Sequence, residues 1–193
     1  LSLCNKNMVK MDTNNDSKAK HDLLAEVCLA AKYEGESITL NYPKYQTTYD
    51  SFPFELCTVL ARSFADIGDI VRGRDLYSRD NRKDKTDKLQ EQLKKYFQKI
   101  HDGLTNGVKE RYTNDGGDFF QLREDWWDAN RHTVWKAMTC SEQLKGNKYF
   151  RATCNISGGD EKTGTLTPSQ CRCDDKPNTD PPTYFDYVPQ YLR

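Results

Sequence analysis

A run of basic side chains between positions 72 and 99 is the part of the chain best suited to binding chemistry. Ten basic residues stand there against five acidic ones, although the 29 basic and 29 acidic residues of the whole chain cancel. Guanidinium forks and ammonium groups on an exposed face bind sulfate and carboxylate groups, and the segment 81–86 has the spacing of glycosaminoglycan-binding segments. The predicted site comprises Arg72, Arg74, Arg79, Arg82, Lys83, Lys85, Lys88, Lys94, Lys95 and Lys99. The alternative is an ordinary solvated helix face, because Asp84 interrupts the run.

Seven cysteines are the second group of residues with chemical potential. No Cys-x-x-Cys pair occurs, and Cys171-Arg-Cys173 lacks a second ligand pair at a suitable spacing, so we expect no metal site. So many cysteines in 193 residues indicate a disulfide framework formed in an oxidising compartment. The odd number leaves one thiol free or paired outside the chain, and about 105 connectivities are then possible. The residues alone favour none of them.

Catalysis finds little support in the sequence. His21, His101 and His132 are scattered, and none stands in a recognisable nucleophile setting. No glycine-rich phosphate loop is present. We therefore predict a protein that is not an enzyme and needs no cofactor. Nucleic acid is also disfavoured, because the net charge is zero and the aromatic residues near the basic run fall on an apolar helix stripe.

The elements that must position these residues are predicted to be helices. From Lys18 to about Tyr33, apolar residues recur at helical spacing, and Gly35 is expected to stop this helix. Residues 36–50 then read as an irregular connector. The clearest helix has Ser51 as its N-cap, Pro53 in its first turn and an end near Gly73. Its apolar stripe is Cys57, Leu60, Phe64, Ile67 and Val71.

Two more helices follow. The third runs from about residue 85 to 101 and has the apolar stripe Leu89, Leu93, Phe97 and Ile100. The fourth, over residues 120–138, is separated from it by a glycine-rich loop at 103–118. Its adjacent residues Trp126 and Trp127 point about 100° apart, so we expect at most one of them to be partly exposed.

The last part of the chain is expected to be less regular. Glu124 and Asp125 should suit the positive end of the dipole of the fourth helix. Residues 141–183 are poor in apolar side chains and are predicted to form a long excursion pinned by disulfides. A new apolar segment, expected to pack the core, begins at Tyr184. The predicted fold class is therefore mainly α, a helical bundle with long loops stapled by disulfides.

Three long sequence blocks carry a resemblance to a known family. They are residues 60–70 (Leu-Ala-Arg-Ser-Phe-Ala-Asp-Ile-Gly-Asp-Ile), 122–127 (Leu-Arg-Glu-Asp-Trp-Trp) and 184–193 (Tyr-Phe-Asp-Tyr-Val-Pro-Gln-Tyr-Leu-Arg). The segments 3–7 and 26–35 add to the match. The chain resembles the alpha-class Duffy-binding-like domain of the variant erythrocyte membrane protein family of Plasmodium falciparum.

The resemblance implies a cysteine-rich helical fold of three subdomains on the extracellular face of the infected erythrocyte membrane. Family members mediate cytoadhesion and rosetting through heparan sulfate, blood-group sugars or complement receptor, and they evade antibodies by varying exposed loops. The implied partners are a host-cell receptor or glycan, the adjacent domains of the same ectodomain, and antibodies. The alternative is a structural and antigenic head domain that positions a neighbouring cysteine-rich, receptor-binding domain.

Against a complete domain of that family, this chain is expected to be a fragment, incomplete at both ends. Residues 1–50 would belong to the first subdomain with a connector, and residues 51–193 to a helical second subdomain that stops before the third. A missing partner would leave Cys4 unpaired, and Cys154 with Cys171 is the expected pair, because both lie in the long excursion and could staple it. The disulfide candidates are Cys28, Cys57, Cys140, Cys154, Cys171 and Cys173. Export and anchoring signals are expected outside these residues.

Overall fold

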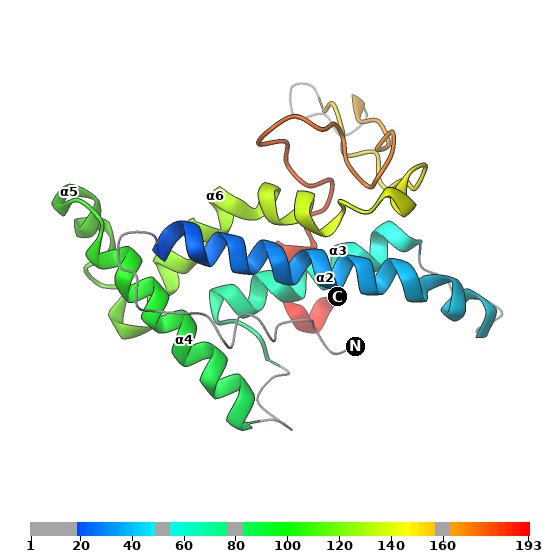
Figure 1. Cartoon of the computed structure of the whole chain (residues 1–193). Coiled ribbons are helices and arrows are strands. Elements are labelled where there is room, and N and C mark those ends of the chain that lie inside the picture. The colour runs from blue at the N-terminus through cyan, green and yellow to red at the C-terminus, as the bar shows by residue number, and fades with distance from the viewer. Residues whose placement is uncertain (1–18, 49–54, 77–82, 157–162) are drawn as a thin grey trace.

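The computed structural model describes residues 19–48, 55–76, 83–156 and 163–193, and these residues form a mainly helical fold. Helix α2 packs against α3, α4 and α6, and α6 also packs against α3 and α4 (Figure 1). The long helices are α2 (Ala19–Thr48), α3 (Leu56–Arg72), α4 (Lys83–Asp102) and α6 (Phe120–Met138). Short helical turns are α5 (Asn106–Lys109), η3 (Glu110–Tyr112), η4 (Gly116–Asp118), η5 (Glu142–Leu144), η7 (Phe185–Tyr187) and η8 (Gln190–Leu192). In the described residues, β structure is limited to isolated bridges, so the predicted fold class is confirmed.

Helix α2 does not stop at Gly35 as predicted, and the expected connector at 36–48 is helical. The reason for the glycine is packing, not chain termination. A Cβ atom at position 35 would lie 2.0 Å from the carbonyl oxygen of Met138, at the end of α6. Glycine therefore lets the two helices approach closely, and local sequence rules cannot distinguish that use of glycine from a stop signal.

Replacing Gly35 with Ala should destabilise the domain even though alanine is the better helix former. Alanine gains about 1 kcal/mol of helix propensity. Pushing α2 and α6 apart costs more, so we expect a net loss of about 2 kcal/mol. The free energy of unfolding in urea measures this, with Gly107→Ala as the control because a Cβ there meets nothing within 4 Å. Equal stability of the two variants would contradict the close-approach role.

Helix α3 follows the prediction. All five residues of its predicted stripe, including Phe64 in the middle, are buried. Gly73 ends it in the left-handed conformation with φ 74°, and the N–H groups of Gly73 and Arg74 donate to the carbonyls of Ile70 and Asp69. This is the Schellman arrangement that favours glycine after a helix. The predicted start at Ser51 and Pro53 lies outside the described residues.

The predicted stripes of α4 and α6 also face the core. Leu89, Leu93, Phe97 and Ile100 are buried, as are Trp126, Trp127, Val134 and Trp135. The expectation that at most one of the adjacent tryptophans is partly exposed is confirmed: Trp126 is 4% exposed and Trp127 is fully buried. α6 can bury both because α4 contacts one side of it, where Phe97 meets Trp126 edge-on, while α3 brings Phe64 against Trp127.

The start of α6 is capped by a residue that the sequence patterns did not indicate. The carboxylate of Asp115 accepts hydrogen bonds from the backbone N–H groups of Gln121 and Leu122, at 2.7 and 2.9 Å. Glu124 and Asp125 lie beyond the first turn and pair with arginines instead: Glu124 with Arg74 and Asp125 with Arg111. Their predicted capping role is therefore wrong.

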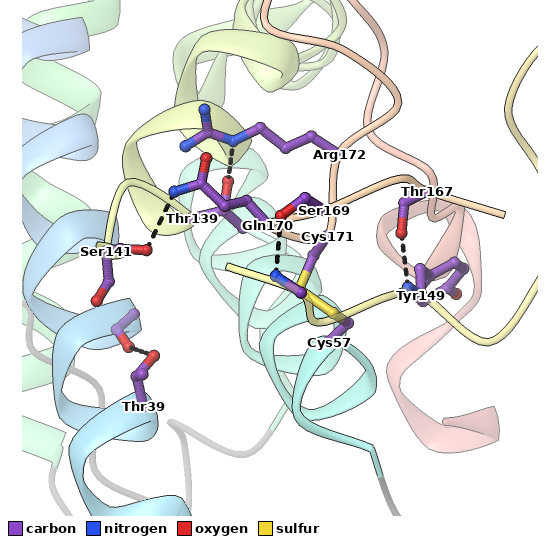
Figure 2. The surroundings of a disulfide bond; sticks show 12 residues. Thr39, Cys57, Thr139, Ser141, Tyr149, Thr167, Ser169, Gln170, Cys171 and Arg172 are labelled. Atoms are coloured by element: carbon purple, nitrogen blue, oxygen red, sulfur yellow. Dashed lines mark hydrogen bonds between the residues drawn. A yellow bond between two sulfur atoms is a disulfide. The ribbon is translucent and has the colours of Figure 1, made fainter. Parts of the chain in front are cut away.

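The excursion after α6 is irregular and held by two disulfides, as predicted, but the pairing differs. Cys57 of α3 is bonded to Cys171, and Cys154 to Cys173, so the predicted pair of Cys154 with Cys171 is wrong. Figure 2 shows that the Cys171 bond ties the excursion to the beginning of α3. Hydrogen bonds around this disulfide, such as Tyr149 N–H to Thr167 Oγ1 at 2.8 Å, hold the neighbouring irregular segments together.

The last block docks through charge, whereas its aromatic rings were expected to pack the core. Asp186 is fully buried and accepts from Arg131 Nε at 2.8 Å, Arg131 Nη2 at 2.9 Å and Trp127 Nε1 at 3.0 Å. Burial by itself would lower the pKa of Arg131, but its bonds to Asp186 outweigh burial and raise the pKa. At the end of the chain, Arg193 pairs with Asp66 and Asp69 of α3. The side chains of Tyr184, Tyr187, Tyr191 and Leu192 are exposed.

Candidate receptor-binding surface

The first residue of the predicted basic site is not on the surface. Arg72 is 1% exposed and donates to Asp69 at 3.0 Å, to the carbonyl of Gly68 at 3.0 Å and to the carbonyl of Asp186. Its guanidinium lies 5.8 Å from the ring centroid of Trp127. Arg72 therefore joins α3 to the last block, and its prediction as a ligand contact is wrong because its side chain is buried and bonded to both segments.

The other members of the predicted site divide by their partners. Arg74 and Lys94 are exposed but ion-paired, with Glu124 and Asp118 respectively. Lys88 and Lys95 are exposed on α4, without an ion-pair partner among the described residues. They are seven residues apart, which places them two turns apart on one helix face. Lys99 is half-buried further along the helix.

Four members cannot be placed on this surface. The backbone of Lys83 and Lys85 belongs to the first turn of α4, and their side chains lie outside the described part of the structure. Arg79 and Arg82 lie outside the described residues. The face of α4 that can be described is therefore narrower than the predicted site, and Glu91 stands on it between its two unpaired lysines.

Two cysteines predicted as disulfide candidates carry free thiols. Cys28 on α2 and Cys140 after α6 are not bonded, so their prediction as disulfide residues is wrong. Cys28 lines a cleft of about 410 Å³ between α6 and residues 172–180. Burial raises the pKa of its thiol to about 11. Cys140 is exposed, and Cys4 lies outside the described residues.

The two free thiols should differ in reactivity. At pH 8 iodoacetamide should alkylate Cys28 at least about tenfold more slowly than the exposed Cys140, since the thiolate is the reactive form and Cys28 is rarely ionised there. Time-resolved peptide mass mapping gives both rates. In urea the rates should converge, because the burial that protects Cys28 is lost. Equal rates in the folded protein, or a disulfide at either residue, would contradict the structure.

The charged side chains around the Cys28 cleft neutralise one another. Arg172 donates to Asp175 and Thr139, Lys136 donates to the carbonyl of Asp175, and Lys176 pairs with Asp174. Across the described residues no group of three His, Cys, Asp or Glu side chains is arranged to hold a metal ion. The cleft thus carries no excess of either charge.

The sequence patterns did not predict a second basic surface. Lys148 and Arg151 are exposed in the excursion, on either side of Phe150, which is 45% exposed. The sequence signal for this surface was the lack of acidic residues in 143–156. That signal points to a surface only when Tyr149 is known to be buried and to anchor the segment.

No helix in the described ranges has the length and apolar character needed to cross a membrane.

A helical frame locked by buried arginines and two disulfides, with exposed cations outside it, defines a disulfide-stabilised helical domain. The chain belongs to the Duffy binding domain family, which matches residues 1–193. This family is one of binding domains and not of enzymes. The resemblance predicted from the three sequence blocks is confirmed.

Solved structures from Plasmodium falciparum are similar to this chain. The NTS-DBL1α1 domain of membrane protein 1 (PfEMP1) from the varO strain has 41% identity and a TM-score of 0.73, covering 98% of this chain and 39% of that chain. The NTS-DBL1α and CIDRγ double domain of the varO PfEMP1 has 40% identity and a TM-score of 0.74, covering 98% and 25%. The ICAM-1-binding DBLβ domain of PfEMP1 IT4var13 has 32% identity and a TM-score of 0.62, covering 96% and 38%.

This chain therefore spans well under half the length of those solved chains. No curated protein matches the sequence. The binding of ICAM-1 is a property of the IT4var13 DBLβ domain itself.

Proposed function

We propose that this chain is a host-cell adhesion module of a parasite variant surface antigen displayed on infected erythrocytes. Its proposed ligand is an anionic glycan, of the heparan sulfate type, bound on the exposed face of α4. Membership of the Duffy binding family, together with relatives that include an ICAM-1-binding domain, supports the general role of receptor binding. The choice of an anionic glycan as the ligand, and of α4 as the surface that binds it, is argued from the side chains of this chain.

The observation that carries this proposal is the pair of unpaired lysines on α4. Lys88 and Lys95 face solvent on one side of the helix, and Lys94 adds a third ammonium group whose ion pair with Asp118 is itself exposed. Exposed ion pairs contribute little and break readily, so an incoming sulfate can compete for Lys94.

Heparin affinity chromatography tests the proposal. The double variant Lys88→Ala/Lys95→Ala should elute at clearly lower salt, because each lost contact removes part of the counterion release that drives binding. The control is Lys20→Ala/Lys32→Ala, which removes two exposed charges from α2 and leaves α4 intact. If both double variants elute alike, α4 is not the contact surface.

A second candidate function is an antigenic head domain that positions a neighbouring domain of the same ectodomain, and it is favoured by a solved relative that is a double domain. Binding to heparin and to erythrocytes, measured for this chain alone and joined to the neighbouring domain, tests it. Binding that appears only with the neighbour supports the head-domain role, and equal binding by this chain alone excludes it.

A further inference from the structure

The excursion carries a basic surface that is separate from α4. Described residues 143–156 and 163–171 contain three basic residues, Lys145, Lys148 and Arg151, and no Asp or Glu. Lys145 pairs with Glu142, whereas Lys148 and Arg151 have no ion-pair partner in the described part of the chain. In a chain of zero net charge, this segment is thus a local excess of positive charge among the described residues.

Tyr149 holds this surface in place. Its side chain is 2% exposed, its N–H donates to Thr167 Oγ1 at 2.8 Å, and its hydroxyl donates to Thr183 Oγ1 at 3.2 Å. Side chains alternate along an extended segment. With Tyr149 pointing inward, its neighbours Lys148 and Phe150 are therefore both turned to solvent. A contact presented by an anchored segment loses less conformational freedom on binding than one presented by a free loop.

An exposed aromatic ring lies between the two cations. Phe150 packs against Tyr149 with ring centroids 4.9 Å apart, and the guanidinium of Arg151 lies 5.3 Å from the Phe150 centroid. Leu166, next to the anchoring residue Thr167, is also exposed, at 46%. The surface therefore offers apolar contact and positive charge within one short stretch of backbone.

We propose that Lys148, Phe150 and Arg151 form a binding subsite for an acidic glycan. The cations would bind carboxylate or sulfate groups, and the apolar C–H face of a pyranose ring would cover Phe150. A glycan fits better than a protein partner, because a specific protein interface buries about 800 Å² on each side, whereas this patch is a narrow track of a few side chains. The subsite goes beyond the α4 surface and does not depend on it, since the excursion and α4 lie in different parts of the molecule (Figure 1).

The test measures binding of the whole chain to immobilised heparin, to hyaluronan as an unsulfated acidic polymer, and to neutral dextran. Lys148→Ala/Arg151→Ala should weaken heparin binding about tenfold, as expected for two lost charge-assisted contacts. Phe150→Ala should weaken heparin binding less. This smaller loss should persist at high salt, because the contact that Phe150 makes is apolar. Dextran should not bind. Circular dichroism and thermal unfolding confirm that the variants fold, and Lys20→Ala/Lys32→Ala again controls for net charge.

The outcomes separate this subsite from the α4 site. Weakening by Lys148→Ala/Arg151→Ala with no effect of Lys88→Ala/Lys95→Ala supports the subsite and removes the α4 proposal. The reverse result overturns the subsite and keeps α4. Loss of binding to a trypsin-sensitive erythrocyte protein in Lys148→Ala/Arg151→Ala, with heparin and hyaluronan binding unchanged, overturns the glycan subsite in favour of a protein partner. Failure of both acidic polymers to bind the unmodified chain overturns both sites.

Discussion

Asp186→Asn should lower the free energy of unfolding by about 3 to 5 kcal/mol, the usual cost of leaving a buried charge without its partner. Arg131 is 4% exposed and donates two hydrogen bonds to Asp186, whose side chain is completely buried. An asparagine side chain keeps the shape but supplies no negative charge. The remaining acidic partner of Arg131, Asp180, lies 3.6 Å away and is 75% exposed, so it cannot compensate. Domains are stable by only about 5 to 15 kcal/mol, so this loss is large.

Asp180→Asn is the matched control, since it removes the other acid from the same arginine. It should cost less than about 1 kcal/mol, because exposed ion pairs contribute little. Urea unfolding followed by circular dichroism measures both variants. A double replacement, Arg131→Met/Asp186→Leu, should be less destabilised than Asp186→Asn, because it removes both buried charges together. If Asp186→Asn and Asp180→Asn are equally stable, Asp186 does not hold the last block.

Removing the Cys57–Cys171 disulfide should have a comparable effect. The bond joins residues separated by 114 positions, so it restricts most of the unfolded chain. The chain-entropy relation gives a loss of about 4.8 kcal/mol for Cys57→Ala/Cys171→Ala. Both cysteines are fully buried, so the alanines also leave small cavities, which add to the loss.

The second disulfide provides the comparison. Cys154 and Cys173 are separated by 19 positions, so the same relation gives a loss of about 3.3 kcal/mol for Cys154→Ala/Cys173→Ala. Beyond that difference in stability, the first variant should free the excursion from α3, while the second should loosen the excursion alone. Hydrogen exchange distinguishes the two: protection at the start of α3 should fall only when Cys57 is replaced. A larger loss for the shorter loop would contradict the assigned pairing.

The helices that carry the apolar stripes could be predicted, and the reason is local. Leu89, Leu93 and Phe97 recur at helical spacing, and a periodic apolar face can be satisfied only by burial, whatever the partner. Gly73 could be predicted as the end of α3, because the left-handed conformation that ends a helix is set by the local backbone and favours glycine. Gly35 was misread because its role depends on Met138, which is about a hundred positions away in the sequence.

Charge was the least predictable feature of the candidate site. Arg72 belongs to a basic run that suggests a surface contact, yet it lies in the core. There its guanidinium donates hydrogen bonds to Asp69 and to the carbonyl of Asp186. Lys148 and Arg151 were not predicted as a binding surface, because two cations around an aromatic residue form a surface only when Tyr149 turns inward. A side chain with a long flexible stem can place its charge inside or outside, and its sequence neighbours do not decide which.

By itself, the sequence determined a mainly helical, disulfide-stabilised domain of the Duffy binding family, because apolar periodicity, helix ends and the three long blocks are properties of contiguous residues. Only the tertiary structure decided which cysteines pair, which arginines are buried and which cations remain on the surface. Those outcomes depend on contacts between residues far apart in the chain. Asp186 meets Arg131 across 55 positions and Cys57 meets Cys171 across 114, so no local pattern could specify either partner.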